Sequence, residues 1–139
     1  LDDLYIMSMP PAGIDLHDRV FLANPLVVVA PRGHALAARK ALRIADLRDE
    51  RFVLRERGSG TRIAAESQFR RLRFAPAVRL ELGSNEAVRA SVAGGLGLSV
   101  LSLHALGPKP AAAGVVVLPV EGFPIPSQWH VVRRRGRQA

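Results

Sequence analysis

Two turns of this chain carry residue types that suit anion binding, and each follows a short apolar run. The first has the sequence GSGTR at residues 58–62, after the run 52–55, and the second has GSNE at residues 83–86, after the run 78–82. A helix is expected to begin at each turn. The first N–H groups of a helix have no partner within it and attract negative charge. The two turns therefore predict a binding site for a small anion.

The first turn is the stronger of these two signals. Its glycines let a ligand approach the backbone closely. Ser59 and Thr61 supply hydroxyl groups, and Arg62 supplies a guanidinium for charge-assisted hydrogen bonds. A tight turn with a Ser or Thr helix cap explains the same residues, so both interpretations stay open. The turn is not a Walker A phosphate loop, because the Lys-Ser/Thr ending is absent.

The second turn has a simpler explanation in an ordinary helix start. Ser84 suits an N-cap, and Asn85 and Glu86 suit the first helical turn. The functional interpretation gains weight from position, because both turns would lie beyond the carboxyl ends of strands. Open α/β sheets bind their ligands there.

Other chemistry finds little support in the residues. The four histidines, His17, His34, His104 and His130, lack metal-ligand spacing, and the absence of cysteine excludes a disulfide scaffold and a thiolate metal site. Ser59 and Ser102 are not in a nucleophile-elbow context, and paired catalytic carboxylates are not evident. We therefore predict no enzyme, no metal site and no cofactor.

The order of apolar runs indicates the elements that must hold the turns. Residues 26–101 alternate as β-α-β-α-β-α-β, which predicts a wound α/β lobe. Both ends of the chain are strand-rich, so the first and last segments are expected to belong together, with the middle as an inserted lobe. The chain begins within an apparent strand and ends just after another, which suggests a fragment.

The composition and net charge limit the classes of binding partner that the chain is expected to have. The chain has 139 residues, 48% of them hydrophobic, and a net charge of +8. Clustered arginines would favour nucleic acid, but these are scattered apart from the run at 133–137 and lack interleaved aromatics. A solvated basic surface is the simpler explanation, so direct DNA contact by this chain is not expected. No stretch approaches the roughly 20 apolar residues of a membrane span.

Several segments, in order, carry a family resemblance. Residues 26–37 (LVVVAPRGHALA), 52–62 (FVLRERGSGTR), 83–88 (GSNEAV) and 92–98 (VAGGLGL) are similar to effector-binding domains of LysR-type transcriptional regulators. The returning strand at 128–132 is similar too, so the resemblance covers essentially the whole chain. The start, 3–11 (DLYIMSMPP), resembles the subgroup that controls RuBisCO (Calvin-cycle) operons.

The resemblance implies a fold and an organisation. The expected fold is α/β, a periplasmic-binding-protein-like (type 2) pair of lobes, here lacking the start of lobe I and its last helix. Residues 1–25 would form part of lobe I, 26–110 lobe II, and 111–139 the return to lobe I. A DNA-binding helix-turn-helix would lie upstream and provide the only DNA contact. The intact protein is expected to be a cytoplasmic homodimer or tetramer without a membrane segment.

The same resemblance leads to a function. A small anionic metabolite, phosphorylated or carboxylated, would bind between the lobes and change the conformation of a DNA-bound oligomer that controls carbon-fixation genes. The expected effector-binding residues are Ser59, Gly60, Thr61, Arg62, Ser84 and Asn85 from lobe II, and Met9, Pro10 and Pro11 from lobe I. Glu86 should lie to the side. The alternatives are a periplasmic solute-binding protein of a transporter and a metabolic enzyme, such as a dehydratase, on the same scaffold.

Overall fold

Strand β1 (Leu26–Pro31) lies at the centre of a three-stranded sheet, between β4 (Ser99–Ser102) and β5 (Val115–Leu118). Both pairings are antiparallel. The structure is a computed structural model that describes residues 24–126. The apolar sequence of β1 fits its position, since residues 26–30 are buried and face apolar neighbours on both sides of the sheet.

Strands β2 (Arg51–Arg55) and β3 (Ala77–Leu82) form a separate parallel pair. An isolated parallel bridge joins Phe52 to Leu98, immediately before β4. Strands β2, β3 and β4 therefore run in the same direction, and their carboxyl ends lie at one edge, where antiparallel β1 begins.

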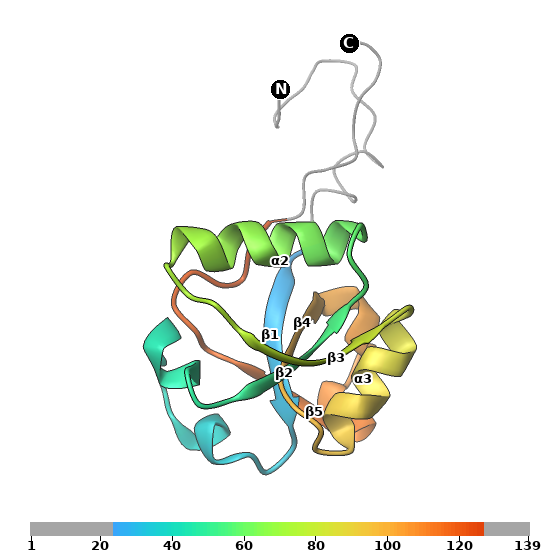
Figure 1. The fold of residues 1–139 in the computed structure, drawn as a ribbon. Coiled ribbons are helices and arrows are strands. Elements are labelled where there is room, and N and C mark those ends of the chain that lie inside the picture. The colour runs from blue at the N-terminus through green and yellow to red at the C-terminus, as the bar shows by residue number, and fades with distance from the viewer. Residues whose placement is uncertain (1–23, 127–139) are drawn as a thin grey trace, which may run out of the picture. The chain divides into compact units, whose positions relative to one another are not determined.

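Within residues 24–126, the two α-helices cover opposite faces of the strands. Helix α2 (Gly60–Arg71) buries Ala65 and Phe69 in a cluster with Phe52, and helix α3 (Asn85–Ala93) buries Val88 and Val92 in another. Phe52 and Val53 alternate along β2 and belong to these two different clusters. Figure 1 shows α2 across the top of the view and α3 at its right-hand side.

Four short 3-10 turns complete the connections. They are η1 (Ala35–Ala38), η2 (Ile44–Leu47), η3 (Leu103–Leu106) and η4 (Pro110–Ala113). Between residues 24 and 126, no helix is long and apolar enough to cross a membrane.

The expected alternation of strands and helices differs from the structure in one respect. Helices α2 and α3 and the parallel pair β2–β3 follow the predicted pattern, but β1 is antiparallel to both of its neighbours. The connection from β1 to β2 contains only η1 and η2 rather than an α-helix. A wound parallel unit needs a crossover of a dozen or more residues, usually helical, so β1 pairs instead with strands distant in sequence.

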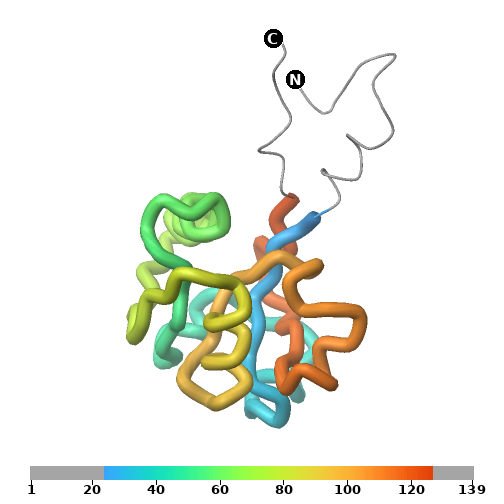
Figure 2. Tube along the Cα trace, turned by 90° about the vertical axis from the view of Figure 1, so that its right-hand side faces the viewer, coloured from blue at the N-terminus to red at the C-terminus, as the bar shows by residue number. Residues whose placement is uncertain are grey.

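The described residues from Leu26 to Ile125 form one compact unit. Because β5 pairs with β1, residues 115–125 belong to this unit. Leu26 and Ile125 exchange backbone hydrogen bonds of 2.8 and 2.9 Å, so the chain enters and leaves the unit side by side. Figure 2 shows this last segment running beside β1. The division of the whole chain into lobes I and II stays a prediction.

Candidate functional site

The two turns singled out by sequence lie next to each other. Because β2 and β3 are parallel neighbours with Arg55 opposite Leu82, the chain leaves both strands at the same edge. The N–H of Glu56, directly after β2, donates to the carbonyl oxygen of Leu82 at 3.0 Å. Both helix N-termini therefore begin from one short stretch of sheet edge.

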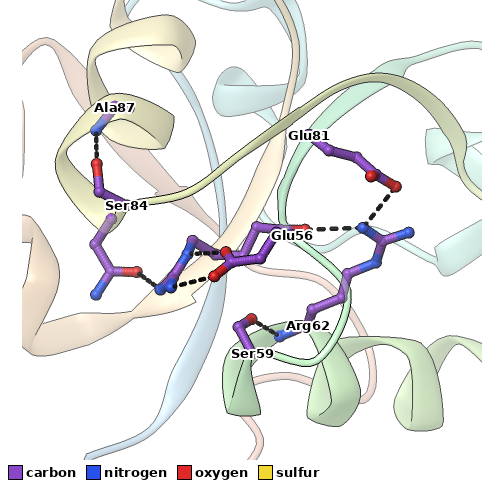
Figure 3. A network of polar contacts seen from close by, with 8 residues as sticks. Glu56, Ser59, Arg62, Glu81, Ser84 and Ala87 are labelled. Carbon is purple, nitrogen blue, oxygen red and sulfur yellow. Dashed lines mark hydrogen bonds and ion pairs between the residues drawn. The ribbon is translucent and has the colours of Figure 1, made fainter.

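Each turn contains a serine that caps its helix. The Ser59 Oγ accepts a hydrogen bond of 2.9 Å from the N–H of Arg62, and the Ser84 Oγ accepts one of 3.0 Å from the N–H of Ala87 (Figure 3). The capping interpretation of both serines is therefore correct. It does not compete with ligand binding, because each hydroxyl hydrogen stays available to donate.

The first turns of α2 and α3 leave backbone donors unused. Among the described residues, the N–H groups of Gly60, Thr61, Asn85 and Glu86 have no acceptor. This is the ordinary condition of a helix N-terminus, whose partial positive charge favours an anion. The Thr61 hydroxyl also makes no hydrogen bond within residues 24–126. Thr61 is half-buried and Gly60 is exposed.

Arg62 differs from its expected role. Its side chain is only 3% exposed, and its guanidinium points into the protein. Nε donates to Glu66 at 2.9 Å. Nη1 donates to the Arg55 carbonyl oxygen at 2.8 Å and to Glu81 at 3.0 Å, as Figure 3 shows. These bonds join α2 to the ends of β2 and β3. In this structure Arg62 organises the turn, and its direct contact with an effector stays untested.

Arg55 forms a second polar cluster that sequence reasoning missed. Its Nη1 donates to the Asn85 Oδ1 at 2.7 Å, which connects the end of β2 to the start of α3. Its Nε and Nη2 donate to the two carboxylate oxygens of Glu56 at 2.9 and 3.4 Å. Hydrogen bonds from Arg55, and then from the residue's own backbone, hold the pKa of Glu56 below its usual value. Sequence order hid this cluster, because Arg55 and Asn85 are 30 residues apart.

The remaining candidates have other positions. His34 caps η1, with Nδ1 accepting from the Leu36 N–H and Nε2 at 3.0 Å from Glu50, so its role is structural. Ser102 ends β4 at the same edge as the two turns and caps η3 by accepting from the His104 N–H. Within residues 24–126 no group of three or more His, Cys, Asp or Glu could hold a metal ion. Met9, Pro10, Pro11, His17 and His130 lie outside the described residues.

Comparison with known proteins decides the family. The family described as "LysR substrate binding domain" matches residues 2–139. The chain belongs to this family. The resemblance expected from the motifs is thus confirmed, and with it the α/β fold of the periplasmic-binding-protein type.

Curated relatives of this LysR domain are transcriptional regulators. The chain is 43% identical over 138 residues to the transcriptional activator CmpR of Synechocystis, and 44% identical over 137 residues to the RuBisCO operon transcriptional regulator of Acidithiobacillus ferrooxidans. The matched region includes 99% of this chain in both comparisons, but only 45% and 44% of those two proteins. It therefore spans less than half their length.

A solved regulatory domain supports the same placement. The structure of the Synechocystis PCC6803 CcmR regulatory domain, in complex with 2-PG, is 46% identical with a TM-score of 0.70. The match covers 84% of this chain and 56% of that one.

Proposed function

We propose that this chain is the effector-sensing part of a LysR-type regulator of carbon-fixation genes, and that its effector is a small anionic, phosphorylated metabolite. The observation that carries the proposal is the 46% identity to a regulatory domain solved with 2-PG. Relatives that regulate RuBisCO operons, 43–44% identical to this chain, support the same target genes.

The geometry of the two turns supports an anion as the effector. Four backbone N–H groups without acceptors and the Ser59, Thr61 and Ser84 hydroxyls are all able to donate. We propose that Ser59, Gly60 and Thr61 bind the anion from one turn, and that Ser84 and Asn85 bind it from the other. Hydrogen bonds from donors to a charged acceptor are about twice as strong as neutral ones.

Arg62 has a different part in this proposal. As a 3% exposed cation it holds the first turn of α2 against β2 and β3, so that the free N–H groups keep their direction. The expected wall formed by Met9, Pro10 and Pro11 of lobe I stays a prediction.

Regulation would follow from a shift between conformations. An effector changes such an equilibrium only by binding one state better than the other. We propose that binding between the lobes favours closure and that a cytoplasmic homodimer or tetramer transmits it to DNA through an N-terminal helix-turn-helix.

The rival functions are less well supported. A transport receptor would share the fold, but the matching curated relatives are transcriptional regulators. The same relatives disfavour a metabolic enzyme.

Calorimetric titration of the intact protein with 2-PG tests the proposal. We expect saturable binding of 2-PG and none of glycerol, an uncharged control that offers hydroxyls without an anion. An absence of heat with 2-PG, in protein that unfolds cooperatively on heating, would contradict the proposed effector class.

A further inference from the structure

Arg55, at the end of β2, bonds both to the Glu56 carboxylate and to the Asn85 side chain at the second turn. We infer that Arg55 is a positioning residue: it fixes the Asn85 side-chain amide so that Asn85 presents only N–H donors to the ligand. The site thereby selects oxyanions. This inference rests on the proposed function and adds to it the residue that sets the ligand's chemistry.

The orientation of Asn85 follows from the chemistry of its partner. A guanidinium has N–H donors and no acceptor, so the group that faces Arg55 Nη1 at 2.7 Å must be the amide oxygen of Asn85. The oxygen and nitrogen of an amide are assigned from such partners. The Nδ2 amino group is therefore turned away from Arg55, and its hydrogens have no acceptor within residues 24–126.

Arg55 is itself held in place. Its side chain is 17% exposed, and the Glu56 carboxylate accepts bonds from Nε and Nη2 on the other side of the guanidinium. This pairing also offsets the charge of Arg55. Arg55 would therefore affect an anion at this edge mainly by orienting the Asn85 amide, and less through its own charge.

The serine hydroxyls at this edge of the sheet are also able to donate hydrogen bonds to a ligand. Ser59 and Ser84 each accept from a backbone N–H and retain a hydroxyl hydrogen to donate. Two carboxylates at this edge are paired with arginines, Glu56 with Arg55 and Glu81 with Arg62. Asn85 is the group whose orientation could reverse this pattern, since an amide can present either an oxygen or a nitrogen.

Arg57 provides a matched control for the charge. It lies two residues after Arg55, just before the first turn, but its side chain is 82% exposed and its Nε lies 3.9 Å from Glu81. In the described part of the chain it has no bond to Asn85. Arg57→Ala therefore removes the same charge from the same stretch of chain without changing the orientation of the amide.

The experiment is a double-mutant cycle in the intact protein, with 2-PG as the probe and calorimetry as the readout. Arg55→Ala and Asn85→Ala are measured singly and together, beside Arg57→Ala. Asn85→Ala is expected to fold, because Ser84 rather than Asn85 is the helix cap and alanine is a good helix former. Arg55→Ala is expected to fold because Arg55 is the last residue of β2 and belongs to neither apolar cluster. We expect Arg55→Ala to weaken 2-PG binding about tenfold, the effect of losing one well-oriented charged hydrogen bond. In the Asn85→Ala background the same change should cost less than about twofold.

Two further variants separate positioning from general structural support. Asn85→Asp keeps a partner for Arg55 and a favourable charge at a helix N-terminus, so the protein should unfold at the same temperature or higher. It replaces the amino group with an acceptor, so 2-PG binding should fall by more than about tenfold. Arg55→Lys retains one donor toward Asn85 and should restore part of the affinity lost in Arg55→Ala.

The outcomes distinguish the inference from the proposed function. Equal losses from Arg55→Ala in both backgrounds, or unchanged binding by Asn85→Asp, would overturn the positioning role while leaving anion sensing intact. A loss in Arg57→Ala as large as in Arg55→Ala would show that charge alone matters. Failure of the unmodified protein to bind 2-PG would overturn both.

Discussion

At the scale of single residues, the arginines and the small polar residues of the site have separate tasks. The guanidinium groups of Arg55 and Arg62 are largely buried and bonded to protein acceptors. The groups that we propose for ligand contact are hydroxyls, backbone N–H groups and the Asn85 amide. We propose that this arrangement recognises an anion by directed hydrogen bonds rather than by exposed charge.

Thr61→Val tests the contribution of one such hydroxyl. Valine has nearly the same shape, and the Thr61 hydroxyl has no partner among the described residues, so the free energy of unfolding should change by less than about 0.5 kcal/mol. The affinity for 2-PG should fall by about 1.5–3 kcal/mol, the contribution of a hydrogen bond to a charged group. Thr61→Ser, which keeps the hydroxyl, is the control for calorimetry. Unchanged affinity in Thr61→Val would remove this residue from the site.

Glu56 gives the pH dependence of stability a defined sign. Its pKa is lowered in the folded protein by hydrogen bonds from Arg55 and its own backbone, so its ionised form is favoured on folding. That contribution is fully present above the ordinary glutamate pKa and is lost as the pH falls through the lowered value. Urea unfolding from neutral to acidic pH should show Glu56→Gln less stable than the unmodified protein near pH 7, with a difference that shrinks on acidification. A difference independent of pH would contradict the ion pair.

Ser99, unlike Glu56, is a buried polar residue without a hydrogen-bond partner among residues 24–126. Its side chain is fully buried, and its Oγ has no hydrogen-bond partner, alone among the buried side-chain polar atoms of residues 24–126. Ser99→Ala removes an unsatisfied group and should leave stability unchanged or raise it by about 1 kcal/mol. Ser102→Ala is a matched control on the same strand, because it removes the cap of η3 and should destabilise by about 1 kcal/mol. Thermal unfolding of both variants checks the contrast.

At the scale of elements, the site exists because two parallel strands end together. Strand β2 is held on its other side at Leu98, whose N–H donates to the Arg51 carbonyl oxygen and whose carbonyl oxygen accepts from the Val53 N–H, each at 2.8 Å. A Cβ on Gly97 would lie 2.6 Å from the same Arg51 oxygen. The close approach of these two segments therefore requires glycine at position 97.

Gly97→Ala should accordingly destabilise the unit by about 1–3 kcal/mol, the usual effect of overpacking a close contact. Gly83→Ala is the control, since a Cβ there meets nothing within 4 Å and its φ does not demand glycine. Denaturant unfolding should show a large loss for the first variant and a small change for the second. Equal stabilities would mean that the bridge to Leu98 does not hold β2.

The sequence predicted helices, their caps and the shared edge more successfully than it predicted strand pairing. Caps and apolar periodicity are local, so α2 and α3 could be read from Ser59, Ser84 and the residues that follow them. The antiparallel pairing of β1 depends on partners 70 or more residues away, and no local pattern encodes it. The burial of Arg62 and the Arg55–Asn85 bond depend on how strands meet, so they emerged only from the structure.

At the scale of the whole molecule, we propose that the described unit is one part of a larger sensor. Its entry and exit, Leu26 and Ile125, are paired directly to each other, so both connections leave from one place. The chain spans less than half the length of the regulators that it matches. Sensing by the described unit therefore has to be tested in the intact protein.

The most direct test is a crystal structure of the intact protein grown with 2-PG. The account predicts an oxyanion of the ligand within hydrogen-bond distance of Ser59 Oγ, the Thr61 N–H and Asn85 Nδ2. Arg62 should keep its bonds to Glu66 and Glu81, and Arg55 its bond to Asn85. A ligand bound away from both turns, or one contacted by Arg62 in place of the backbone donors, would contradict the account.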